Sequence, residues 1–141
     1  MIYTSYFAKI KELEKNNIVP ISICGKAPDW YKGLQYKKFA PKYDFFMKWK
    51  ETKDNDYYIK CFNEQVLDKI DISIVLEDLY FMLPKDKRDI LDTVNCPFWC
   101  NPDIHLAFIC YEKSEDFCHR HLVADWFKSN EVACEEYSFN E

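Results

Sequence analysis

The sequence predicts an α/β fold: a small, mostly parallel sheet with helices on both faces. Two runs of strand length, 2–7 and 18–24, are rich in β-branched and aromatic residues, and a helical segment separates them. Residues 104–110 are apolar throughout, which is typical of a central parallel strand covered on both faces. Strand–helix–strand order at both ends of the chain therefore favours a layered α/β sheet, and the length of 141 residues favours one domain over 1–141.

The first third of the chain supplies two strands, a short helix and a long loop. Residues 8–16 read as the helix between the strands. Pro20 lacks a backbone N–H, so it places the second strand near a sheet edge or puts the proline at the beginning of that strand. Residues 25–40 contain both glycines of the protein, and their apolar residues show no clear helical or strand periodicity. Loops of that length inside a compact domain are usually functional.

The middle of the chain is expected to be helical. Pro41 opens the first segment, and residues 55–70 and 71–83 form the next two, with Asp71 as candidate N-cap and Pro84 as the terminator. Three aromatic residues of the first segment lie at helical spacing and are expected in the core: Phe45, Phe46 and Trp49.

The last third is expected to contain an irregular segment, the central strand, a helix and a final strand. Residues 84–103 are polar, hold three prolines and are predicted to be irregular. A helix over about 117–129 follows the central strand, with Asp116 or Ser114 as its N-cap, and residues 132–139 are a candidate final strand.

Charge is unevenly distributed along the chain. The net charge is −5, yet residues 26–50 hold seven lysines against two aspartates. An acidic total argues against generic coating of nucleic acid, whereas one local basic surface suits a small anionic or nucleotide ligand. With only two glycines, neither G-x-x-x-x-G-K-[ST] nor G-x-G-x-x-G can occur, and no cofactor is predicted.

Cysteine usage and the N-terminus favour a reduced, cytoplasmic protein. The seven cysteines are an odd number without the dense spacing of a disulfide framework. The first ten residues lack the pattern of a secretory signal, and no apolar run approaches the ~18 residues of a membrane span. No membrane partner is therefore expected, and the oligomeric state is left open.

The densest group of reactive residues stands at the start of the last helix, as Cys118-His119-Arg120-His121. Carboxyl ends of parallel strands carry the ligand sites of such sheets, so the loops after residues 24 and 110 should meet there. On a helical wheel His119 falls within the apolar arc, Cys118 and Arg120 flank it, and His121 faces water.

Each of these residues has two interpretations. Cys118 is a nucleophile activated at a helix start or a small packed side chain, and His119 is a base or a buried, satisfied histidine. Arg120 near a helix start opposes the dipole and is a candidate for anion binding.

The loop 25–40 offers a second candidate surface. Lys26, Trp30, Tyr31 and Lys32 alternate cations with aromatic rings, a combination that stacks on a base with cations near phosphate. Alternatively, the rings pack the loop onto the sheet and the lysines are solvated.

Metal binding is not predicted. The wheel sends His119 and His121 to different faces, so these two cannot both join Cys110 and Cys118 around one ion. A second, weaker candidate metal site would use two cysteines of the irregular segment and one histidine of the strand: Cys96, Cys100 and His105.

The stretch LAFICYEKSEDFCHRHLVADWF resembles the C-terminal signature of the family known as domain of unknown function 488, and the likeness covers nearly the whole chain. The resemblance implies a Rossmann-like α/β domain with its cysteines near the candidate active site, and it implies no particular reaction. Residues carried over from the signature and from the first loop are Cys110, Glu112, Cys118, His119, Arg120, Trp30, Tyr31, Lys32 and Gly33. One segment departs from the family pattern: residues 83–105 replace a short Gly-Gly-Lys turn, so either this loop caps the site in its own way or the activity has diverged.

Three functions are compatible with these residues. The first is an enzyme-like protein acting on a nucleotide, nucleobase or other phosphorylated ligand. Its residues would be Arg120, Lys26 and Lys32 for the anion, Trp30 and Tyr31 for stacking, and Cys118, or Cys110 with Glu112, for chemistry. The second is a binding module for a nucleotide or protein without turnover. The third is a thiol redox sensor with a reversible disulfide between Cys110 and Cys118.

Overall fold

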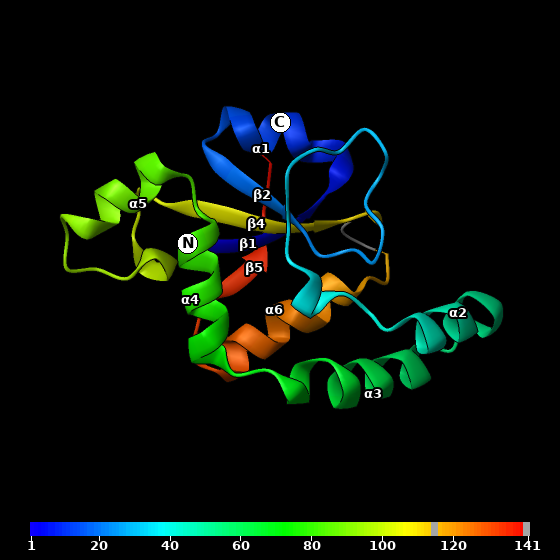
Figure 1. The fold of residues 1–141 in the computed structure, drawn as a ribbon. Helices are drawn as coiled ribbons and strands as arrows, with labels where there is room; N and C mark the ends of the chain where they lie inside the picture. The colour runs from blue at the N-terminus through cyan, green and yellow to red at the C-terminus, as the bar shows by residue number, and fades with distance from the viewer. Residues whose placement is uncertain (114–115, 140–141) are drawn as a thin grey trace.

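The computed structural model describes residues 1–113 and 116–139, and its centre is a five-stranded sheet (Figure 1). The strands are β1 (Ile2–Tyr6), β2 (Ile18–Ser22), β3 (Leu34–Gln35), β4 (His105–Cys110) and β5 (Cys134–Glu136). Their order is β3-β2-β4-β1-β5, and every neighbouring pair is parallel. The predicted α/β class is confirmed, with a sheet that is parallel throughout.

Helices cover both faces of the sheet, as predicted (Figure 1). They are α1 (Ile10–Lys15), α2 (Tyr43–Thr52), α3 (Asn55–Gln65), α4 (Ile72–Met82), α5 (Lys85–Asp92) and α6 (His119–Ser129). Helix α1 lies on one face, whereas α6, with α3 and α4 nearby, lies on the other (Figure 1). Among the helices so described, none is both long enough and apolar enough to cross a bilayer.

Strand β4 is the central strand that its apolar sequence predicts. It pairs with β1 on one side and with β2 on the other, and all its residues after His105 are buried. Leu106 and Phe108 join the larger core with α6, while Ala107 and Ile109 join the smaller core with α1. Both faces of the strand are therefore covered, which explains why its side chains do not alternate in polarity.

Pro20 lies where the sheet tolerates it. Strand β3 pairs with β2 only at Ile21 and Ser22, one residue after the proline. The Pro20 carbonyl oxygen lies 3.4 Å from the Tyr31 hydroxyl oxygen, on the side of the strand that β3 does not reach at this residue. The prediction of a near-edge position is confirmed, although β3 itself was hidden inside the loop 25–40.

Helix α5 corrects the prediction that residues 84–103 are irregular. Helix α4 ends at Met82 after the predicted Asp71 cap, whose carboxylate accepts from the Ser73 N–H at 2.8 Å. Pro84 then serves as the N-cap residue of α5 instead of introducing a loop. The buried residues of α5 are Lys87 and Leu91, so the helix has no apolar run that would reveal it in the sequence.

The start of the last helix differs from the prediction as well. Helix α6 begins at His119, and its N-cap residue is Cys118 in an extended conformation, not Asp116. The alternative cap, Ser114, lies outside the described residues. Cys118 is covalently tied to Cys110 at the end of β4, which places it before the helix and not within its first turn.

Candidate functional site

The loops after β2 and β4 meet at the same edge of the sheet, as the strand order predicts. The Ile23 N–H donates to the Ile109 carbonyl at 3.1 Å, which extends the pairing of the two strands past β2. Further out, the Tyr111 hydroxyl donates to the Lys26 carbonyl at 2.8 Å. The two loops are thus joined by a backbone hydrogen bond next to the strands and by a hydrogen bond from a side chain further out.

A pocket of about 840 Å³ opens between these two loops and helix α2. Its size is within the usual range for small-molecule sites. Its lining comes from the first loop, from α2 with its flanks, and from the segment after β4: Cys24, Gly25, Lys26, Ala40, Pro41, Tyr43, Phe46, Trp49, Lys50, Lys53, Cys110, Tyr111, Glu112 and His119.

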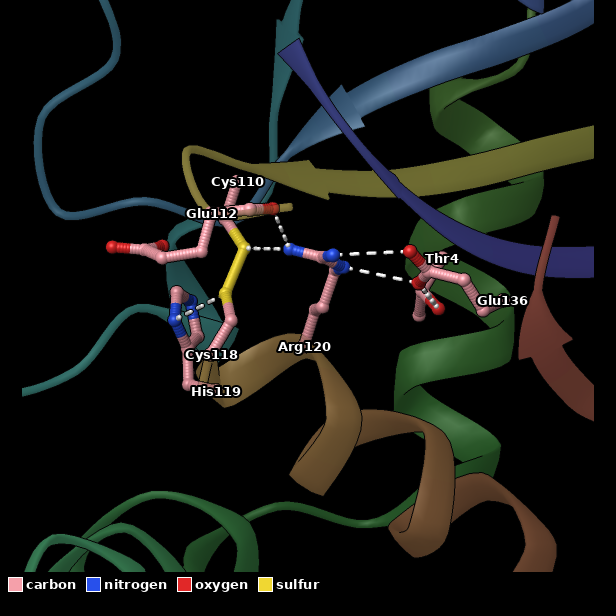
Figure 2. Close-up of polar contacts among 7 residues, drawn as sticks. All are labelled: Thr4, Cys110, Glu112, Cys118, His119, Arg120 and Glu136. Carbon is pink, nitrogen blue, oxygen red and sulfur yellow. Dashed lines mark hydrogen bonds and ion pairs between the residues drawn. A yellow bond between two sulfur atoms is a disulfide. The ribbon is translucent and has the colours of Figure 1, made fainter. Parts of the chain in front are cut away.

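A disulfide between Cys110 and Cys118 lies at the base of this edge (Figure 2). Both residues are buried, and Cys110 also lines the pocket. The other five cysteines are free thiols. The prediction of a fully reduced chain is wrong for this one pair, because the fold brings the end of β4 against the start of α6.

His119 lies beside the disulfide and is buried, as the helical wheel predicts. Its Nε2 is 2.7 Å from the Ile23 carbonyl oxygen, which can only accept, so Nε2 carries the hydrogen. Burial lowers the pKa of His119 to about 4, so the ring is neutral near pH 7. The lone pair is therefore on Nδ1, which lies 3.8 Å from the Cys118 sulfur (Figure 2).

Arg120 lies on the far side of the disulfide and is completely buried. Its Nε and Nη2 each lie 3.0 Å from a carboxylate oxygen of Glu136, and Thr4 donates to the same carboxylate. Its Nη1 donates to the Cys110 sulfur at 3.0 Å and to the Glu112 carbonyl at 2.7 Å. Arg120 does not line the pocket, so an internal ion pair replaces the ligand anion that the sequence led us to expect (Figure 2).

The first loop contributes one of its predicted ligand residues, Lys26, to the pocket. Tyr31 is buried, and its hydroxyl donates to the Leu34 carbonyl at 2.6 Å, so this ring packs the loop onto the sheet. Trp30 is exposed, and neither it nor Lys32 lines the pocket. A Cβ at Gly33 would lie 2.6 Å from the Tyr31 hydroxyl, so glycine is required there for close packing and not for ligand binding.

Helix α2 supplies the aromatic wall that the sequence analysis did not predict. Tyr43, Phe46 and Trp49 recur every third residue and so share one side of the helix. Only Phe45 of the three predicted core aromatics is fully buried, while Phe46 and Trp49 are half-buried and line the pocket. The spacing is visible in the sequence, but it does not distinguish a pocket wall from a core face.

Lysines accompany these rings. The Lys50 Nζ lies 5.3 Å from the centre of the Phe46 ring, and the Lys53 Nζ lies 4.2 Å from that of Trp49. Alternation of cations with rings, expected in the first loop, is therefore found on α2.

Two further groups complete the site. Glu112 lines the pocket and is half-buried, in line with its candidate role. Cys24 lines it too, but burial raises the pKa of this thiol to about 12, so it is protonated at neutral pH. His121 is half-buried, not fully exposed to water as the wheel suggested.

Three of the four metal-capable side chains considered for this site do converge. Within residues 1–113 and 116–139, a group of Cys110, Cys118 and His119 has its ligand atoms within 4.8 Å of one another, and His121 is not part of it. The sulfurs of Cys96 and Cys100 are 3.8 Å apart in another part of the fold, and His105 does not complete a cluster with them there.

Comparison of the chain with family models, with curated proteins and with solved structures found no match. Kinship with the domain of unknown function 488 family therefore stays a prediction based on the signature residues.

Proposed function

We propose that this is an enzyme-like protein that binds a small ligand combining an aromatic ring with an anionic group, such as a nucleotide, beside a reactive sulfur pair. The observation that carries the proposal is the pocket at the carboxyl edge of the sheet. Its wall alternates rings and lysines, and its base reaches Cys110.

The aromatic wall suits a nucleobase. Trp49 and Phe46 are half-buried, which leaves ring surface available to the pocket. Stacking of a base on an aromatic side chain is worth about 1–3 kcal/mol and tolerates different bases. The geometry favours ring binding without identifying one base.

The lysines suit an anion. Lys26, Lys50 and Lys53 line the pocket, against the single carboxylate of Glu112. None of the ion pairs found within the described part of the chain involves these three lysines. A phosphate group entering the pocket would therefore meet cations that carry no carboxylate partner among those pairs.

Paired charge-removing variants test this proposal by titration calorimetry with AMP. We expect Lys50→Gln/Lys53→Gln to weaken AMP binding at least tenfold, because two of the three pocket cations are lost. Lys11→Gln/Lys15→Gln removes the same charge from exposed positions of α1 and should leave the affinity within about twofold. Equal affinities in both variants, or no binding of AMP by the unaltered protein at millimolar concentration, would refute nucleotide binding in this pocket.

A second candidate function, a thiol redox sensor, is favoured by the disulfide itself. Oxidation would remove two electrons and two protons from the Cys110 and Cys118 thiols, with a peroxide as the oxidant that is reduced to water and an alcohol or to water alone. In a cytoplasmic setting, which we also propose, such a pair would respond to the thiol pool.

Equilibration in glutathione buffers, followed by acid quenching and mass spectrometry, measures this property. A sensor predicts a midpoint potential above about −300 mV, whereas structural disulfides lie below that value. The measurement belongs in a Cys96→Ser/Cys100→Ser background, because those sulfurs are also close together. A pair that stays oxidised throughout the range would exclude the sensor.

The same cluster supports a proposal of kinship. Five signature residues, separated by up to ten positions, come together around one disulfide in Figure 2: Cys110, Glu112, Cys118, His119 and Arg120. We therefore propose that the chain is a divergent member of the domain of unknown function 488 family.

A further inference from the structure

We propose that, once the disulfide is reduced, Cys110, Cys118 and His119 bind one thiophilic divalent metal ion of the Zn²⁺ type, with a fourth coordination position open toward the pocket. This inference does not depend on nucleotide binding. It rests on the placement of three ligand atoms and of the groups behind them.

The three ligand atoms are already gathered. Two sulfurs and one imidazole nitrogen lie within 4.8 Å of one another, and all three residues are buried. Zinc bonds of about 2.3 Å to sulfur and about 2.0 Å to nitrogen require ligand atoms that are about 3.5–3.8 Å apart, so the two sulfurs must move apart once their bond is broken. The distance of 3.8 Å from His119 Nδ1 to the Cys118 sulfur has that value.

The orientation of His119 is the second, independent observation. A histidine that binds a metal typically donates its other ring N–H to a carbonyl or carboxylate, which fixes the tautomer and the ring plane. Here Nε2 donates to the Ile23 carbonyl at 2.7 Å, so the lone pair of Nδ1 is aimed at the sulfurs.

Arg120 and Glu136 form a support behind the sulfurs. Arg120 donates to the Cys110 sulfur at 3.0 Å, a contact that stabilises a thiolate. Its charge would repel a cation, but the carboxylate of Glu136 pairs with it through two contacts of 3.0 Å. The pair as a whole is neutral, so a dication bound to two thiolates gains charge balance within the site.

Metal and disulfide exclude each other, because both need the same two sulfur atoms. Reduction breaks the S–S bond with two electrons and two protons from an external dithiol, which itself becomes a disulfide. The metal then displaces the two thiol protons to solvent and binds two thiolates. Since Cys110 and His119 also line the pocket, the fourth position is reachable by water or by a ligand.

Cobalt(II) binding to the reduced protein tests the site directly. The background is Cys96→Ser/Cys100→Ser, which removes the other close pair of thiols. We expect about one equivalent of Co²⁺, thiolate-to-cobalt charge-transfer absorption, d–d bands of four-coordinate strength, and displacement by Zn²⁺. The same protein in its disulfide form should bind no Co²⁺ with these bands, which provides a control without any substitution.

Variants then assign the ligands. His119→Gln and Cys118→Ser, each in that background, should weaken Co²⁺ binding at least a hundredfold, whereas Cys134→Ser, at a buried free thiol in β5, should not. The proposal is overturned if the reduced protein shows no charge-transfer band, if the disulfide form binds equally, or if Cys118→Ser keeps the spectrum. AMP binding is measured on the metal-free disulfide form, so failure of one proposal does not decide the other.

Discussion

At the residue scale, Arg120 shows how a side chain suggested by the sequence acquires a different role in the fold. The sequence places a guanidinium beside a thiol at a helix start, which predicts an anion contact. The structure provides the anion internally, as Glu136 of β5, sixteen residues further on. No local pattern could reveal this partner, because the position of Glu136 depends on the pairing of β5 with β1 in the sheet.

Substitution of Arg120 is expected to destabilise the protein strongly. Arg120→Met should lower the free energy of unfolding by about 3 kcal/mol, because the Glu136 carboxylate loses a buried, two-contact partner. Urea denaturation measures the change. Lys85→Gln, which breaks an exposed ion pair with Asp89, should change it by less than about 0.5 kcal/mol. Similar small losses in both variants would mean that the buried pair contributes little to stability.

Among the signature residues, the sequence predicted His119 better than Arg120. The apolar periodicity of the last helix correctly predicts that His119 is buried, since Leu122, Val123 and Trp126 lie on the same face of that helix. The disulfide could only be offered as one of three alternatives, because pairing depends on how closely β4 and α6 approach.

At the element scale, helix α2 determines the character of the pocket. The sequence predicts the helix and its aromatic residues, but the side they face depends on the angle at which α2 docks. The helix ends at Thr52, and its C-cap residue, Lys53, adopts a left-handed conformation with φ of 56°. That conformation favours glycine, yet the residue is a lysine that lines the pocket.

Glycine at position 53 should therefore raise the stability of the protein while it weakens ligand binding. Lys53→Gly is expected to raise the free energy of unfolding by up to about 1 kcal/mol, because the left-handed backbone no longer strains a side chain. The same variant should bind AMP several-fold more weakly. Glu131, with φ of 64°, provides the matched control: Glu131→Gly should stabilise similarly and leave AMP affinity unchanged.

Denaturation curves and calorimetry on the two glycine variants check both parts. A gain in stability with unaltered affinity in Lys53→Gly would remove this lysine from the site. A loss of stability in both variants would show that the entropy of the added glycine outweighs the relief of strain.

The two elements that sequence patterns missed are short. Strand β3 contains two residues, too few for a period of two to be visible. Helix α5 lies between Pro84 and Pro97 in the sequence, and most of its residues are exposed. Longer elements with apolar runs, such as β4 and α4, were predicted within one or two residues of their observed bounds.

At the scale of the whole molecule, strand order links the sequence to the site. Parallel strands β2 and β4 are neighbours, so the loops after them share one edge, and the sequence was sufficient to predict that meeting. It was not sufficient to predict which side chains face the opening. The expected stacking rings, Trp30 and Tyr31, pack over Phe7 on the α1 side, and rings of α2 take their place.

Nucleotide binding in the pocket is tested most directly by an NMR titration of the isotope-labelled protein with AMP, following the tryptophan indole signals. If AMP binds in the pocket, we expect saturable shifts for the Trp49 indole, with backbone shifts at Lys26 and Glu112, and no shift for the Trp30 indole. Shifts at Trp30 and Lys32 without change at Trp49 would place the ligand on the first loop. No saturable shift at any of these positions would contradict nucleotide binding at this edge of the sheet.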